Sequence, residues 1–96
     1  RVPDLLRELS ECGIDAMVHD PLASADDAQR EYGLELAPLE RFRDLDALVY
    51  AVPHAAYRAL DGDAIWSMGA DGGVLIDVRS ELDPAAAPRG IRYYSL

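Results

Sequence analysis

Apolar positions in this chain follow two patterns, helical spacing at the start and short continuous runs later. The first four apolar positions recur three and four residues apart, at Val2, Leu5, Leu6 and Leu9. This spacing predicts an amphipathic helix, because residues three and four apart share one helix face. Pro3 suits the first turn of such a helix, and Gly13 suits the position just after its last turn.

Two later runs are continuously apolar or nearly so, at Ala47–Val52 and Val74–Val78. Continuous runs of this length, rich in β-branched and aromatic residues, predict strands buried on both faces. Pro53 ends the first run, since proline has no N–H to continue a ladder of hydrogen bonds. Strands of this kind are typical of parallel sheets that helices cover on both faces.

The remaining segments alternate between strand-like and helix-like patterns. Further strands are predicted at residues 14–19, 34–36 and 91–94, and helices or helical turns at 24–32, 38–43, 54–60, 63–68 and after Asp83. Alternating strands and helices favour a parallel sheet with right-handed crossovers. The fold class is therefore α/β, a Rossmann-like three-layer domain with a mainly parallel sheet, formed by residues 1–96 as one domain.

The order of elements lacks one expected strand. A Rossmann-like unit begins with a strand that lies at the centre of the order 3-2-1-4-5-6, whereas this chain begins with a helix. We expect the natural protein to supply that first strand upstream of Arg1. Without it, residues 14–19 would pair directly with Ala47–Val52, or the sheet would be completed by exchange between chains.

The charge of the chain is strongly acidic, with a net charge of −9 over 96 residues. Every basic residue is an arginine. The first 48 residues carry 5 arginines against 12 acids, and the last 48 carry 4 against 6. An acidic surface repels phosphate backbones, which disfavours nucleic acid as a partner. A few converging arginines can still bind a single anion, and the less acidic second half is the better place to expect this.

Composition excludes several other classes of protein. Half of the residues are hydrophobic, which argues against disorder, yet no apolar stretch approaches the ~18 residues of a membrane helix. No signal peptide is recognised at the first residues. The single cysteine, Cys12, excludes an intramolecular disulfide and offers no metal cluster, as expected for a cytoplasmic protein. With no basic neighbour, Cys12 is expected to pack half-buried rather than to act as a nucleophile.

Three predicted strands end in side chains with binding chemistry. Asp20 could meet a ribose hydroxyl, although a turn in which its carboxylate accepts a backbone N–H is the favoured interpretation. His54 could donate to an anion, and the favoured alternative is that it caps a helix or makes a local hydrogen bond. Trp66 and Met68 are expected to pack in the core.

Arg79 is the strongest candidate for a binding residue. It directly follows the second buried strand, and its guanidinium could hold a phosphate or carboxylate through two hydrogen bonds. A salt bridge to Glu81 or Asp83 is an equally good interpretation. The sequence contains no Gly-x-Gly-x-x-Gly, no Walker A motif and no Gly-x-Ser-x-Gly, so no catalytic machinery is predicted.

Five motifs in order resemble one known family. They are Val2-Pro3-Asp4-Leu5-Leu6-Arg7-Glu8-Leu9, Val18-His19-Asp20-Pro21-Leu22-Ala23, Glu31-Tyr32-Gly33, Ala51-Val52-Pro53-His54 and Ile76-Asp77-Val78-Arg79-Ser80. Together with the closing Ile91–Leu96, they resemble the C-terminal domain of UDP-glucose/GDP-mannose dehydrogenases. The His-Asp-Pro and Val-Pro-His forms are most similar to the Vi-polysaccharide branch, whose members oxidise UDP-N-acetylhexosamines.

The resemblance implies a role in the NAD-dependent oxidation of a sugar C6 alcohol to a carboxylate, in surface polysaccharide biosynthesis. In that family an N-terminal domain holds NAD and a central region supplies the catalytic cysteine. This chain has neither, and the surroundings of Cys12 do not match the catalytic motif. The resemblance therefore implies that the chain helps to enclose the UDP part of the substrate, binds no cofactor itself and is inactive alone.

One substrate-binding feature carries over by position. Arg79 matches the first basic position of the family's Asp-x-Lys or Asp-x-Arg-Arg pattern, and Ser80 stands where the UDP-glucose branch has its second arginine. This substitution weakens the case for an identical diphosphate contact. The predicted substrate-binding residues are Arg79 and Ser80.

Two other functions remain open at this level. The domain could serve mainly as an assembly and packing module, since an absent strand would expose a sheet edge, and a homo-oligomer is expected. An independent sensor of small nucleotides is disfavoured, because the predicted sheet is incomplete.

Overall fold

The computed structural model of the chain describes residues 2–22, 26 and 36–96. The chain falls into two compact units, Arg1–Arg41 and Phe42–Leu96, which are described separately. Throughout the described residues, each helix is too short or too polar to cross a membrane.

The first unit begins with helix α1, Val2–Glu11, which confirms the predicted amphipathic helix. The helix ends in a Schellman motif, in which Gly13 has φ +81°. The N–H of Gly13 donates to the carbonyl of Ser10 at 3.0 Å, and the N–H of Ile14 donates to the carbonyl of Leu9 at 2.9 Å. A glycine is favoured here because side chains disfavour positive φ. The neighbouring Cys12 is exposed, so the expected half-buried packing is wrong.

The strand predicted for residues 14–19 is not a regular strand. Only Val18 pairs, in an isolated parallel bridge with Leu36, next to a hydrogen bond of 2.8 Å from the N–H of Ala37 to the carbonyl of Val18. A single bridge leaves the rest of the segment without a ladder, and Ile14 stays 51% exposed. The predicted helix 24–32 and most of the predicted strand 34–36 lie outside the described residues. The turn predicted at 38–43 is confirmed by the 3-10 helix η1, Leu39–Arg41.

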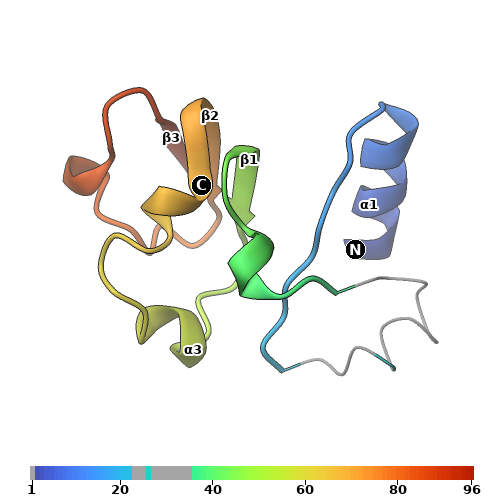
Figure 1. Cartoon of the computed structure of the whole chain (residues 1–96), viewed down its shortest axis with the longest axis horizontal. Coiled ribbons are helices and arrows are strands. Elements are labelled where there is room, and N and C mark those ends of the chain that lie inside the picture. The colour runs from blue at the N-terminus through green and yellow to red at the C-terminus, as the bar shows by residue number, and fades with distance from the viewer. Residues whose placement is uncertain (1, 23–25, 27–35) are drawn as a thin grey trace. The chain divides into compact units, whose positions relative to one another are not determined.

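The second unit contains a three-stranded parallel sheet, which confirms the predicted α/β class. Its strands are β1 (Leu45–Tyr50), β2 (Gly69–Asp77) and β3 (Arg92–Ser95), in the order β1-β2-β3. Figure 1 shows the three strands side by side, with α3 beyond one end of them. The connections carry α3 (Ala55–Arg58) and two 3-10 helices, η2 (Trp66–Met68) and η3 (Pro84–Ala86).

The core of this unit forms around the central strand, β2. Leu75 is 2% exposed, and the connection that precedes β2 contributes the buried side chains of Ile65, Trp66 and Met68. The ring of Trp66 packs against that of Tyr93 on β3, with their centroids 5.2 Å apart. The prediction that Trp66 and Met68 are packing residues is confirmed.

The first apolar run was predicted to be buried on both faces, and this is wrong. Val49 and Val52 are 50% and 51% exposed, because among the described elements β2 alone packs extensively against β1, and Val52 lies beyond the end of that strand. β1 also ends at Tyr50, two residues before the predicted end. Direct pairing of residues 14–19 with this run stays a prediction, because the two segments belong to units that are described separately.

β2 begins five residues earlier than predicted, through a glycine-rich bulge. The register shifts between Leu45, which faces Gly69, and Ala47, which faces Val74. At Gly73 a Cβ would lie 2.9 Å from the carbonyl oxygens of both Ala70 and Leu45, so a larger residue cannot fit without moving backbone. Glycine therefore permits the close approach of the two strands at this bulge.

Candidate functional site

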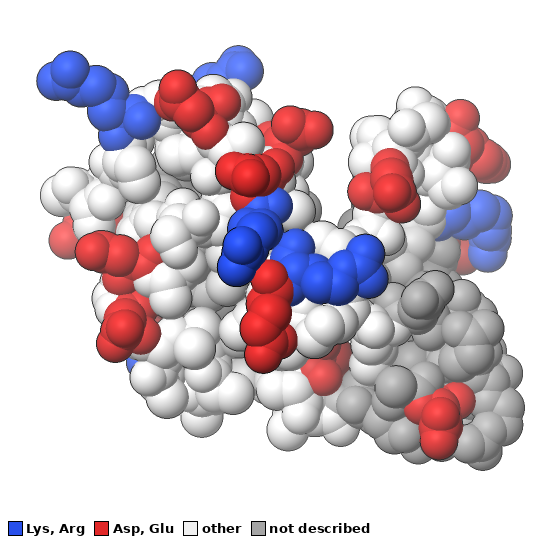
Figure 2. All heavy atoms as spheres, viewed as in Figure 1, with Lys and Arg blue, Asp and Glu red and all other residues white. Residues whose placement is uncertain are grey.

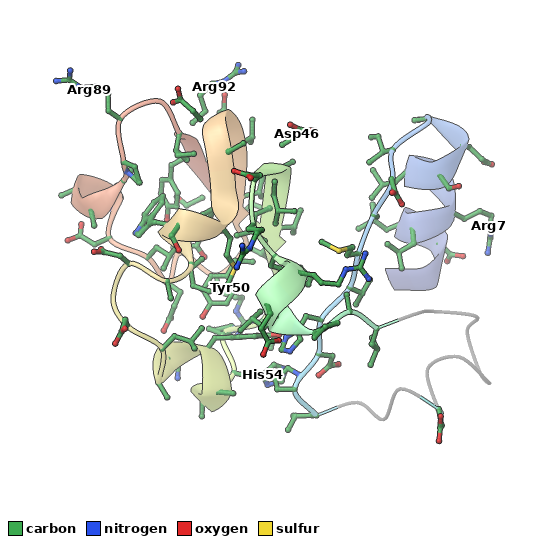
Figure 3. The ribbon with its side chains drawn as sticks, viewed as in Figure 1. Arg7, Asp46, Tyr50, His54, Arg89 and Arg92 are labelled. Carbon is green, nitrogen blue, oxygen red and sulfur yellow. The ribbon has the colours of Figure 1, made fainter. Side chains whose placement is uncertain are left out.

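The carboxyl ends of the three strands lie at one edge of the sheet. Tyr50 faces Asp77 in the register of β1 and β2, and Asp77 faces Ser95 in that of β2 and β3. In Figure 3, Tyr50 and His54 lie toward this edge, whereas Asp46, Arg89 and Arg92 lie toward the opposite end of the strands. Open α/β sheets bind ligands at the carboxyl edge.

The loop that follows β2 is organised by Asp77, which is fully buried. Its Oδ2 accepts a hydrogen bond of 2.7 Å from the N–H of Leu82 and one of 2.8 Å from the hydroxyl of Tyr93. The same hydroxyl lies 3.3 Å from the carbonyl oxygen of Leu82. One carboxylate thus joins the end of β2, the far side of its loop and strand β3.

This environment keeps Asp77 ionised. Burial by itself would raise the pKa of the carboxyl, but the backbone amides of Leu82, Glu81 and Arg79 and the hydroxyl of Tyr93 outweigh it and lower the pKa. The second oxygen, Oδ1, is buried and has no hydrogen-bond partner of good geometry among the described residues. The amides of Glu81 and Arg79 therefore act on the carboxylate mainly as nearby dipoles.

Arg79 and Ser80 lie at the tip of this loop, and both are exposed. Ser80 has φ +53°, a left-handed conformation that is uncommon outside glycine, asparagine and aspartate. Its N–H donates to the carbonyl of Asp77 at 3.3 Å, and its hydroxyl donates to the carbonyl of Leu96 at 3.2 Å. The loop is thus fixed at Ser80 as well as at Leu82.

The guanidinium of Arg79 makes no hydrogen bond or ion pair with the residues that the structure describes. The salt bridges considered from the sequence are not formed. Glu81 instead pairs with Arg58 of α3, at 2.6 Å from Nε and 3.3 Å from Nη2. Asp83 accepts a hydrogen bond of 3.0 Å from the N–H of Ala85 at the start of η3. The donors of the Arg79 guanidinium are therefore not used by the described residues.

Tyr50 is a buried aromatic residue at this edge, which the sequence analysis did not identify as part of the site. Its ring meets that of Tyr57 edge to face, with centroids 5.8 Å apart. Burial first, and then the charges of Glu81 and Asp77, raise the pKa of its hydroxyl against the opposite effect of Arg58. A tyrosine inside an apolar run was a usable signal, because the hydroxyl of a buried tyrosine usually finds a hydrogen-bond partner.

Asp77 and Tyr93 were also missed as functional residues. The signal for Asp77 was visible, since an acid inside an otherwise apolar strand must find hydrogen-bond donors when it is buried. Tyr93 gave no comparable signal, because its partner lies 16 residues away in the sequence.

His54 marks the start of α3 through its backbone. Its carbonyl accepts from the N–H groups of Tyr57 and Arg58 at 3.0 and 3.2 Å, while its side chain makes no capping hydrogen bond. Its ring lies over that of Tyr57 with centroids 5.9 Å apart. Residue 54 thus stands at the N-cap position of α3, but the expectation that the imidazole caps this helix is wrong.

Asp20 belongs to the first unit, where its Oδ1 accepts a hydrogen bond of 2.9 Å from the N–H of Leu22. This confirms the favoured interpretation of a turn.

The surface charge agrees with the sequence. On the face drawn in Figure 2, acidic side chains are widely spread and the central arginines stand beside acids, so that this face carries no extended basic patch. Among the described residues, no group of three or more histidine, cysteine, aspartate and glutamate side chains could hold a metal ion.

Comparison with known proteins places the chain among nucleotide-sugar enzymes. Residues 1–84 match the family model described as the UDP-glucose/GDP-mannose dehydrogenase family, UDP binding domain. A UDP-N-acetyl-D-glucosamine 6-dehydrogenase of Pseudomonas aeruginosa is 34% identical over 83 residues, 86% of this chain. The protein CapL of Staphylococcus aureus is 29% identical over 79 residues, and a UDP-N-acetyl-D-glucosamine 6-dehydrogenase of Salmonella typhi is 28% identical over 79 residues.

The matched region is a small part of each relative. The chain spans 20%, 18% and 19% of these three proteins, and 82% of the chain is covered by each of the last two. No solved structure gives a significant match. The family match covers the carboxyl ends of β1 and β2 and the loop that carries Arg79 and Ser80, and the chain belongs to the UDP-glucose/GDP-mannose dehydrogenase family, in its UDP-binding domain.

Proposed function

We propose that residues 1–96 form the C-terminal, UDP-binding domain of a longer NAD-dependent nucleotide-sugar 6-dehydrogenase. Family membership supports this assignment, as do relatives that carry the matched region in about a fifth of their length. The single observation that carries it at the level of residues is Arg79, an exposed and unpaired guanidinium at the carboxyl edge of a parallel sheet.

In this proposal the complete enzyme oxidises the C6 alcohol of a UDP-sugar to a carboxylate, in the cytoplasm, for surface polysaccharide biosynthesis. The present chain contributes no catalytic residue. It has no Gly-x-Gly-x-x-Gly motif, so the residues present do not fit NAD, which the rest of the enzyme would bind. We also propose that the enzyme is a homo-oligomer.

The two loop residues would take different parts of the nucleotide. Arg79 offers a planar set of donors that matches phosphate oxygens or ribose oxygens. The hydroxyl proton of Ser80 is used by the carbonyl of Leu96 at 3.2 Å, so Ser80 can offer acceptor lone pairs only. Ser80 would therefore accept from a ribose hydroxyl rather than donate to a phosphate.

The test is Arg79→Ala in the full-length protein. We expect KM for the UDP-sugar to rise roughly 10- to 100-fold, the size of a lost charge-assisted hydrogen bond, with KM for NAD unchanged. Arg89→Ala is the matched control, because Arg89 is exposed and lies toward the opposite end of the sheet. Equal effects of Arg79→Ala on the two KM values would contradict the assignment.

A second candidate function is assembly, and the exposed side chains of Val49 and Val52 on and after the terminal strand favour it. Titration of the chain with UDP separates the two functions. Heat of binding at millimolar UDP or below supports nucleotide binding, whereas self-association without UDP binding supports the assembly module.

A further inference from the structure

We propose that Tyr93, acting through Asp77, is a positioning residue that holds the loop of residues 78–82 in the conformation that presents Arg79 to the nucleotide. The inference rests on the proposed function of Arg79 and adds to it a residue outside the region of the family match, which ends at residue 84.

The first argument is the geometry of the loop. It leaves β2 at Asp77 and returns to the same carboxylate at Leu82, whose N–H lies 2.7 Å from Oδ2. A five-residue segment closed onto one buried oxygen has few conformations open to it. The hydroxyl of Tyr93 donates to that oxygen from β3 at 2.8 Å and so fixes its orientation.

The second argument is the unusual backbone at the tip. Ser80 has φ +53°, which the surrounding contacts must maintain because serine disfavours it. The loop anchors on either side of Ser80, at Asp77 and Leu82, are the two groups that Tyr93 contacts, at 2.8 and 3.3 Å. Loss of the Tyr93 hydroxyl would loosen both anchors at once, and Arg79 lies between them.

The third argument is that Tyr93 has an adjacent counterpart without these contacts. Tyr94 follows it on β3 and is 53% exposed, and its hydroxyl makes no hydrogen bond within the described part of the chain. Successive side chains of a strand point to opposite faces, so the two tyrosines differ in surroundings and not in chemistry.

The experiment uses the full-length protein with Tyr93→Phe, and Tyr94→Phe as the matched control. Phenylalanine removes one oxygen and keeps the ring that packs 5.2 Å from Trp66. We expect KM for the UDP-sugar to rise roughly three- to tenfold, the net size of one hydrogen bond, with kcat and KM for NAD unchanged. Tyr94→Phe should leave all three constants unchanged.

Coupling to Arg79 separates positioning from general stability. Introduced into Arg79→Ala, Tyr93→Phe should raise KM for the UDP-sugar no further, because the group that it positions is gone. If Tyr93→Phe is too unstable to assay, Asp77→Asn is expected to show the same coupling. A full additional increase in the Arg79→Ala background would overturn the proposal, as would an unchanged KM in the single variant.

The outcomes distinguish this proposal from the function on which it rests. A loss of UDP-sugar affinity in Arg79→Ala together with an unchanged Tyr93→Phe overturns positioning and leaves the proposed function intact. An unchanged KM for the UDP-sugar in Arg79→Ala would overturn both the positioning role of Tyr93 and the proposed function of Arg79.

Discussion

Strands β1 and β2 look alike in sequence and differ in structure. Both centre on short apolar runs and they pair in parallel, with Leu48 facing Leu75 and Tyr50 facing Asp77. Leu75 is 2% exposed, whereas Val49 on β1 is 50% exposed. The difference comes from neighbours, because β2 is paired on both sides and β1 on one. An apolar run therefore predicts a strand without saying whether it is central or terminal.

The position in the sheet also separates the loops that follow the two strands. After β1 the chain passes through Pro53 into α3, and the pairing of Arg58 with Glu81 fixes that helix to the neighbouring loop. After β2 the loop is fixed from inside by the buried carboxylate of Asp77. The candidate binding residue Arg79 lies on the second of these loops.

The largest expected effect is that of Leu75→Ala in the central strand. Removing a fully buried leucine side chain should lower the free energy of unfolding by about 2–5 kcal/mol, through lost burial and the cavity left behind. Chemical denaturation followed by circular dichroism measures it. A cost below that of truncating the facing Leu48 would break the distinction between the two strands.

A smaller effect is expected for Asp77→Asn at the end of the same strand. The variant should lose about 1–3 kcal/mol at pH 7, since it loses hydrogen bonds to a buried ionised acceptor. The native pKa of Asp77 lies below the unfolded value of 3.8, so its stabilisation is complete above that pH and is lost as the pH falls through the native pKa.

Denaturation at several pH values tests this sign. The difference in stability between the native protein and Asp77→Asn should be largest near neutral pH and should shrink below about pH 4. A difference that grows on acidification would contradict the role given to the carboxylate.

The smallest effect is expected for Val49→Ala on β1. A valine that is half exposed in a terminal strand should cost about 1 kcal/mol or less, as for other substitutions away from the core. The stability cost of Val49→Ala should be measured both in this chain and in the full-length protein. A much larger cost in the full-length protein would show that another segment covers β1 there, as the hypothesis of an upstream first strand predicts.

The sequence predicted those parts of the fold that depend on local patterns. The spacing of Leu5, Leu6 and Leu9 and the glycine at position 13 define α1 and its end. Each of the two apolar runs overlaps a strand, and the parallel class follows from their alternation with helices. The strand at residues 14–19 was wrong, because a strand needs a ladder of bridges, and among the described residues this segment forms a single bridge, at Val18.

The site was predicted in part, and for a physical reason. Arg79 was found because it follows a strand directly, which is a local property. Arg79 does not pair with Glu81 because Glu81 pairs with Arg58, which is 23 residues away in the sequence. The loop that carries Arg79 is anchored at Asp77, whose carboxylate accepts a hydrogen bond from Tyr93. Contacts between distant positions arise only when the parallel strands are in register, and one sequence does not show that register.

The packing of Trp66 against Tyr93 has a practical consequence. Trp66 is the single tryptophan of the chain, it is 3% exposed, and its ring centroid lies 5.2 Å from that of Tyr93. Within this chain, one indole therefore accounts for the tryptophan emission, and it does so from beside the residue that supports the Arg79 loop. The fluorescence of the unlabelled domain should report the order of the Arg79 loop.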